Sequence, residues 1–148
     1  MSHQIKTKKL NRPKPHRQSM MRNLATALFA HRMIETTDAR AKELRRFADR
    51  LISIAKTDTL AARRQVARDI QDKAVHKKLF TEIVPQLGDR TSGFTRVMKK
   101  GIRRGDASVI SVVELLTPRP KKEEQSSKKK RKKSKAKTEE TAPEAAAE

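Results

Sequence analysis

The residues of this sequence whose types and spacing could do chemistry are mainly cations, and the first group of them lies near the N-terminus. The segment KTKKLNRPKPHRQ, residues 6–18, has five Lys or Arg residues before Pro15, two prolines and no acid. Prolines favour an extended backbone, and each cation that neutralises a phosphate releases counterions. We therefore predict RNA contacts here and on the helix that follows, at Lys8, Lys9, Arg12, His16, Arg17, Arg22 and Asn23. The alternative is a basic terminus that only water surrounds.

Two further groups of cations follow along the chain. The expected second helix contributes Arg40, Lys42, Arg45 and Arg46, and the segment RVMKKGIRRGD contributes Arg96, Lys99, Lys100, Arg103 and Arg104. Gly101 and Gly105 would let the backbone of this segment approach a phosphate closely. Lysines also protect the exposed edge of a sheet against pairing with another chain, and that is the alternative for this segment. We expect RNA contact at both groups.

Catalytic and metal-binding patterns are missing from the sequence. The histidines His3, His16, His31 and His76 do not form an H-E-x-x-H or similar metal motif, and the chain has no Cys and only four glycines. Paired carboxylates such as Asp69 and Asp72 are best explained as groups at helix ends. We expect no enzyme activity, no cofactor, no metal and no small-molecule substrate.

The composition predicts a polyanionic partner. The chain has 148 residues with 37 Lys and Arg against 17 Asp and Glu, for a formal net charge of +20. Such a charge attracts nucleic acid or anionic lipid and opposes compactness. Only 34% of the residues are hydrophobic and 3% are aromatic, so the core should be small and aliphatic. No apolar run approaches the roughly 18 residues that a membrane span needs, and the absence of Cys fits a reducing, cytoplasmic setting.

Three regions differ in charge and in apolar content. Residues 1–15 form a basic arm, residues 16–118 contain nearly all the periodic apolar positions, and residues 119–148 are Lys-rich and then acidic and Ala-rich. The last region has no large apolar residue to bury, so we expect it to be a disordered tail. Its KKKRKK block resembles a nuclear localisation signal, but such runs are common, and we expect only nonspecific nucleic-acid affinity.

The periodicity of residues 16–118 predicts an α+β domain. Apolar residues recur at helical spacing over about 15–31, 38–56, 59–68 and 73–84, whereas 33–36, 94–102 and 108–116 have strand-like patterns. We expect caps from Thr37 with Asp38, from Asp58 and from Asp72, and a helix end at Pro85 and Gly88. The hairpin turn should span residues 101–105. The expected fold has two layers, with about four helices on a small three-stranded mixed sheet.

Several segments resemble one family. These are IETTDARAKELRR at residues 34–46, DRLISIAK at 49–56, LNR at 10–12, His16-Arg17, Arg22-Asn23, and GFTR at 93–96. Over about residues 3–118 the chain resembles the bacterial family of the seventeenth large-subunit ribosomal protein. Ser2 stands where the family usually has Arg, and Phe94 stands where Tyr is common, which removes a hydroxyl hydrogen bond. The tail lies outside the resemblance.

The resemblance implies a structural protein of translation that binds large-subunit ribosomal RNA near the mouth of the polypeptide exit tunnel. Neighbouring large-subunit proteins would be its other partners. Sequence readout should be slight, because the chain has no Tyr or Trp and its four Phe lie mostly on apolar faces. The alternatives are a nucleoid DNA-binding protein, an RNA-modifying enzyme and a membrane-surface binder. The nucleoid protein would bind duplex DNA as well as RNA. The RNA-modifying enzyme would need a cofactor loop, and the membrane-surface binder would need an unpartnered amphipathic helix.

Overall fold

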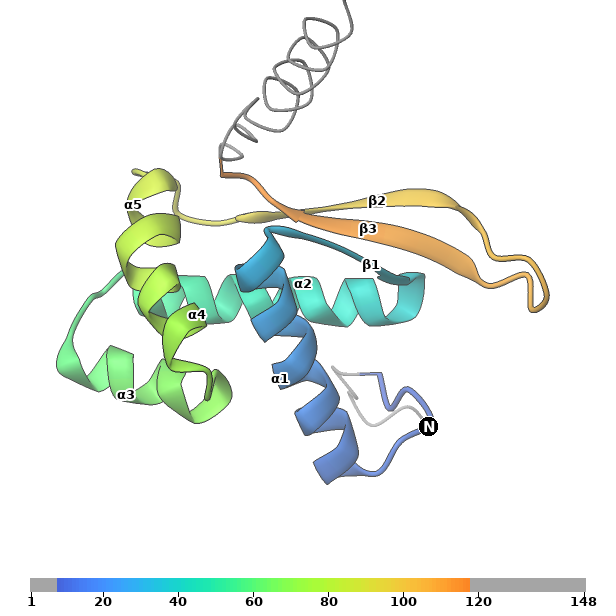
Figure 1. Cartoon of the computed structure of the whole chain (residues 1–148), viewed down its shortest axis with the longest axis horizontal. Helices are drawn as coiled ribbons and strands as arrows, with labels where there is room; N and C mark the ends of the chain where they lie inside the picture. Colours follow the sequence, from blue (N-terminus) through green and yellow to red (C-terminus); the bar gives the residue numbers. More distant parts are fainter. Residues whose placement is uncertain (1–7, 118–148) are drawn as a thin grey trace, which may run out of the picture. The chain divides into compact units, whose positions relative to one another are not determined.

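The computed structural model describes residues 8–117, so the first seven residues and the expected tail lie outside it. Its elements, in chain order, are α1 (Lys14–His31), β1 (Met33–Thr37), α2 (Asp38–Ala55), α3 (Leu60–Asp69), α4 (Lys73–Lys78), the π-helical turn η1 (Leu79–Ile83), α5 (Val84–Gln86), β2 (Thr95–Ile102) and β3 (Val109–Leu115). Because α4, η1 and α5 follow one another without a break, the described residues hold four helical rods and three strands (Figure 1). The predicted α+β class is confirmed.

The sheet has the order β1-β3-β2, and both pairs of strands are antiparallel. The expectation of a mixed sheet is therefore wrong in this respect. The backbone N–H of Leu115 donates to the carbonyl of Arg32 at 2.9 Å, just after α1 ends. Strand β1 thus begins where β3 ends, and the two strands must run in opposite directions.

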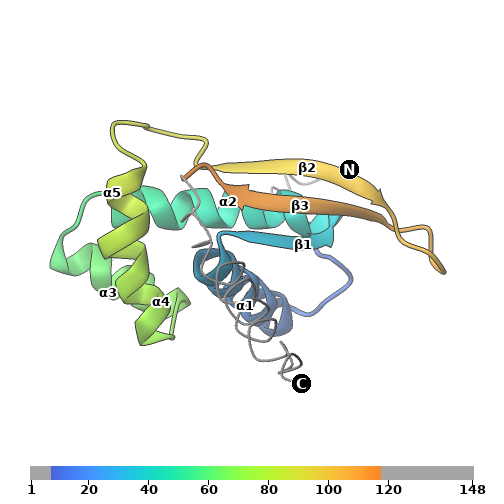
Figure 2. The same cartoon turned by 45° about the horizontal axis from the view of Figure 1, so that its top comes forward.

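The helices cover one face of the sheet. Helix α2 contacts all three strands, and α1 packs against both α2 and the sheet (Figures 1 and 2). The core is made of fully buried aliphatic and aromatic side chains, including Leu28, Phe29, Leu44, Ile52, Phe94 and Val113. In Figure 1 the far end of the β2–β3 hairpin extends beyond the helices. This arrangement gives the cationic side chains of α1, α2 and the hairpin one common framework.

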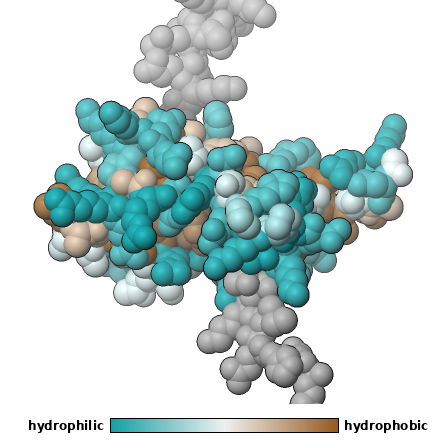
Figure 3. Space-filling view, turned by 90° about the horizontal axis from the view of Figure 1, so that it is seen from below, coloured by the Kyte–Doolittle hydropathy of each residue, from teal (hydrophilic) through white to brown (hydrophobic). Residues whose placement is uncertain are grey.

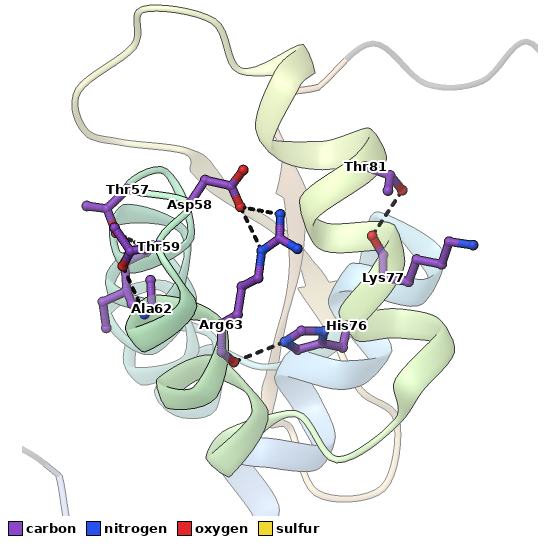
Figure 4. Close-up of polar contacts among 9 residues, drawn as sticks. Thr57, Asp58, Thr59, Ala62, Arg63, His76, Lys77 and Thr81 are labelled. Atoms are coloured by element: carbon purple, nitrogen blue, oxygen red, sulfur yellow. Dashed lines mark hydrogen bonds and ion pairs between the residues drawn. The ribbon is translucent and has the colours of Figure 1, made fainter.

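The start of α3 differs from the predicted cap. The residue at the N-cap is Thr59, whose Oγ1 accepts a hydrogen bond from the Ala62 backbone N–H at 3.2 Å. Asp58 lies in the left-handed region at φ 45° and instead accepts hydrogen bonds from Arg63 at 2.7 and 2.9 Å (Figure 4). The Arg63 carbonyl lies 3.2 Å from His76 Nε2, so this corner also ties α3 to α4. Asp72 caps α4 as expected, since its carboxylate accepts from the Ala74 and Val75 N–H groups.

Pro85 does not end the last helix, contrary to the prediction. A proline has no N–H, and its ring clashes with the carbonyl four residues earlier. Here the turn Leu79–Ile83 widens to π-helical geometry, and the Val84 N–H donates to the Leu79 carbonyl, five residues back. The helix therefore passes through Pro85, and Gly88 follows at φ +52°.

The hairpin turn spans residues 103–108, between the end of β2 and the start of β3, and so begins later along the chain than the predicted 101–105. Gly101 belongs to β2, opposite Ile110, while Lys99 pairs with Ser111, so Lys100 is an extra residue in a β-bulge. The strands close through the Arg103 N–H, which donates to the Ser108 carbonyl at 2.9 Å. Gly105 occupies the left-handed region at φ 98°, as a glycine in such a turn is expected to do.

Candidate nucleic-acid interface

The described part of the basic arm is not extended, in contrast to the prediction. The Arg12 backbone N–H donates to the Lys9 carbonyl at 3.2 Å, and Leu10 and Asn11 have φ values of 53° and 50°. This tight turn reverses the chain just before α1. Lys8 and Lys9 are exposed, whereas the Arg12 side chain is half-buried. Lys8 and Lys9, together with the exposed Lys14, are therefore the accessible cations in the described part of the arm.

On α1 the predicted contact residues divide into two kinds. His16 and Asn23 are exposed, and Arg17 is half-buried. Arg22 is different, because its Nε lies 3.0 Å from Asp69 Oδ1 at the end of α3. Arg22 therefore ties two helices together, and only the 38% of its side chain that stays exposed is open to a ligand.

On α2 three predicted cations are exposed, and each has an acid within one turn. Lys42 lies 2.7 Å from Asp38, Arg45 lies 3.9 Å from Asp49, and Arg46 lies 4.0 Å from Glu43, while Arg40 is half-buried. The hydrogen bond from Lys42, helped by one from the Ser111 hydroxyl, lowers the pKa of Asp38. The Asp38 carboxylate thus binds Lys42 and Ser111. Thr37, which was expected to cap α2, makes no side-chain hydrogen bond as the N-cap of that helix. The three cations are each more than half exposed, so a phosphate can reach them beside the acid.

Lys56, which follows the last residue of α2, is held by the loop before β2. Its Nζ donates to the carbonyls of Gly88 and Arg90 at 2.8 and 2.5 Å, and it lies 5.6 Å from the centre of the Phe94 ring. Lys56 holds the loop before β2 and is committed to that structural role.

The five predicted cations of the hairpin are all exposed, but they differ in their partners. Three contact acids: Arg96 with Glu114 at 3.5 Å, Lys100 with Glu35, and Arg103 with Asp106 at 2.6 Å. Hydrogen bonds from Arg103 and from the Ser108 hydroxyl and backbone hold the pKa of Asp106 far below its ordinary value. Within residues 8–117, Lys99 and Arg104 make no ion pair within 4.0 Å.

A groove of about 500 Å³ lies between α1, α2 and α3, and it gathers cations from the basic arm, from α1 and from α2. Lys8 from the arm, Arg17 and Arg22 from α1, and Arg46 and Arg50 from α2 line it. Figure 3 views the molecule from below, where hydrophilic side chains cover most of the surface and hydrophobic colour shows between them. We call the groove between α1, α2 and α3 the three-helix groove.

Comparison with known proteins identifies the family. The model of the family described as "Ribosomal protein L17" matches residues 20–116. A protein named "Large ribosomal subunit protein bL17" from Syntrophobacter fumaroxidans is 45% identical over 82% of this chain and 84% of its own length. The protein of the same name from Rubrobacter xylanophilus is 47% identical over 80% of this chain and 98% of its own length. The chain belongs to the ribosomal protein L17 family.

Membership of the L17 family makes the chain a structural protein of the large ribosomal subunit, a cytoplasmic particle in bacteria, and its relatives are not enzymes. Among residues 8–117, no helix is long and apolar enough to cross a membrane. That same stretch contains no group of three or more His, Cys, Asp or Glu placed to hold a metal ion.

Sequence reasoning missed Arg50 and Gln65, which line the three-helix groove of this L17 protein from α2 and α3. Arg50 could have been found, because it follows Arg46 by four residues and so lies on the same side of the helix. Gln65 carried no such signal. Its position in the groove depends on how α3 packs against α2, which local spacing does not specify.

Proposed function

We propose that the chain binds and braces large-subunit ribosomal RNA through phosphate contacts from the arm, α1, α2 and the hairpin. One observation carries this proposal: the exposed cations stand on separate elements of a single packed domain. A mobile basic tail neutralises phosphates without fixing them. Cations on packed helices and on a hairpin hold phosphates at set positions, so one protein can fix several RNA segments relative to one another.

The cations of the interface suit phosphate geometry better than base readout. Most of them are arginines, whose planar guanidinium groups can donate two hydrogen bonds to one phosphate. The cations that contact acids on α2 and the hairpin are each more than half exposed, so a phosphate can reach them from the solvent side. Binding should therefore depend steeply on salt. In a plot of log K against the logarithm of the salt concentration, each phosphate contact should contribute a slope of roughly −0.7 to −0.9.

The position of this protein in the ribosome is part of the same proposal. We propose a position near the mouth of the polypeptide exit tunnel, as membership of the family implies, with neighbouring large-subunit proteins as further partners. Its basic surfaces would face RNA there.

Sedimentation of a tagged full-length copy tests the proposal. Lysate is run through a sucrose gradient after a high-salt wash, with and without RNase, and a parallel sample is treated with DNase. We expect the tagged chain to migrate with large subunits after the wash and after DNase, and to leave that fraction after RNase. A chain that stays at the top of the gradient, or that follows DNA, would contradict RNA bracing and favour a nucleoid protein.

A further inference from the structure

We propose that the three-helix groove binds a single unstacked nucleotide of an RNA, with the base in the groove and the phosphate at its rim. This inference rests on the proposed RNA binding and deepens it, because it adds a pocket for one unpaired residue to a surface of phosphate contacts. The groove volume of about 500 Å³ lies in the range of small-ligand pockets.

Apolar side chains form part of the groove wall. Met21 from α1 and Phe47, Leu51 and Ile54 from α2 all line it, and Phe47 and Ile54 are only half-buried. A site for phosphate alone would have no use for such a surface, because anions bind to donors and to positive charge. Bases, by contrast, bind to aromatic rings and to guanidinium planes. Phe47 therefore gives the groove a surface on which a base can stack.

The polar groups of the groove supply the rest of a nucleotide site. Gln18 and Gln65 each carry an amide that can both donate and accept, which suits the polar edge of a base. Lys8, Arg17 and Arg50 line the same groove, and no ion pair within 4.0 Å occupies them in the described part of the chain. These three cations are the candidates for the phosphate.

The two acids of the groove do not cancel its charge. Asp69 lies 3.0 Å from Arg22, and Glu43 lies 4.0 Å from Arg46 with its side chain only 13% exposed. Each acid thus has its own arginine, and the excess positive charge comes from the other cations. A neutral or cationic ligand gains nothing from that excess, whereas a nucleotide phosphate does.

The first experiment compares two probes on the full-length, isotopically labelled chain by NMR. Nucleoside 5′-monophosphates should shift the Met21 methyl and Phe47 ring signals, whereas inorganic phosphate should shift mainly the arginine side-chain signals. If phosphate alone reproduces the Met21 and Phe47 shifts, the site is an anion site and the nucleotide proposal is overturned.

The second experiment uses two RNA stems that differ by one bulged nucleotide, with 2-aminopurine as the bulged base. We expect the chain to bind the bulged stem about fivefold or more tightly than the other stem, because the bulged base can stack on protein side chains. Binding should also change the fluorescence of the 2-aminopurine base. Arg17→Gln with Arg50→Gln should abolish the preference. Arg64→Gln with Arg68→Gln, on exposed positions of α3 outside the groove, removes the same charge and should leave the preference for the bulged stem unchanged.

The outcomes separate this inference from the proposed function. Equal affinity for the two stems would overturn the nucleotide pocket and leave RNA bracing intact, while no binding to either stem at low salt would overturn both. Thermal melting of each variant identifies a loss of folding. In that case Gln65→Ala, a change at an exposed position, replaces the arginine pair, and unchanged bulge preference in that folded variant counts against the pocket.

Discussion

Arg32 shows how one cation of this basic chain is used inside the fold. Its guanidinium, 8% exposed, donates to Gln86 at 2.7 Å and lies 3.0 Å from Glu82, so it links the end of α1 to η1 and α5. Its backbone has φ 65°, a left-handed conformation that L side chains adopt at a cost. The fold keeps Arg here because the side chain joins elements far apart in the sequence.

Two substitutions at Arg32 separate the side-chain effect from the backbone effect. Arg32→Ala should lower the free energy of unfolding by about 2 kcal/mol, because it removes charge-assisted hydrogen bonds, one of them to a half-exposed Glu82. Arg32→Gly should cost about 1 kcal/mol less than Ala, since glycine adopts φ 65° without strain. Urea denaturation followed by circular dichroism measures both. If Ala proved more stable than Gly, the left-handed conformation would not be a constraint at this site.

The Asp106 carboxylate makes the hairpin turn sensitive to acid in a specific sense. Its pKa is held low by Arg103 first and by Ser108 second, so the folded state favours the charged form. This contribution to stability is present above the ordinary Asp pKa of 3.8 and is lost only as the pH falls through the lower folded value. An NMR titration should find Asp106 still ionised at pH 3.8. In Arg103→Gln its pKa should move back up, and an unchanged pKa there would refute this cause.

At the scale of elements, the hairpin separates cations that support the fold from cations that are open to a ligand. Lys99→Gln with Arg104→Gln should lower RNA affinity and reduce the salt slope by up to about 2, because neither side chain makes an ion pair within 4.0 Å among residues 8–117. Arg96→Gln with Arg103→Gln removes the same charge from residues that contact Glu114 and Asp106, and should have a smaller effect. Filter binding to large-subunit ribosomal RNA over a range of salt concentrations measures both. Equal losses would mean that the ion pairs do not restrict these cations.

The sequence predicted the elements well where local spacing decides structure. The apolar stripe of α1 and the Asp72 cap of α4 depend only on residues within a few positions of one another, and the expected bounds agree closely with Lys14–His31 and Asp38–Ala55. The errors arose where distant residues compete. Pro85 is accommodated by a π-helical turn, and β1 pairs antiparallel with the distant β3, where a mixed sheet was expected.

The candidate interface, too, could be predicted from the sequence only where local spacing decides the position of a side chain. Exposed cations such as Lys42 and Arg45 could be placed from helical spacing alone. The ion pair between Arg22 and Asp69 joins residues 47 positions apart, and the three-helix groove depends on the packing of α1, α2 and α3 together. Tertiary packing therefore decides which cations are structural and which remain available.

At the scale of the whole molecule, a chain with a net charge of +20 binds any polyanion to some extent. The distinctive property of the domain must therefore be the placement of charge, and the test must hold the total charge constant. Arg45→Glu with Arg46→Glu on α2, and Arg64→Glu with Arg68→Glu on α3, each lower the net charge by the same amount. All four side chains are exposed, so both double variants should melt within a few degrees of the parent.

Placement of charge predicts different outcomes for these two variants in assembly. When each is co-expressed with the parent chain, the α2 variant should enter large subunits about tenfold less well, which corresponds to about 1.4 kcal/mol of lost binding free energy. The α3 variant should stay within about twofold, because its arginines lie outside the predicted RNA contacts. Mass spectrometry of the large-subunit gradient fraction gives both ratios. Normal incorporation of the α2 variant would show that this face of α2 does not contact RNA, and equal losses in the two variants would mean that total charge alone drives assembly.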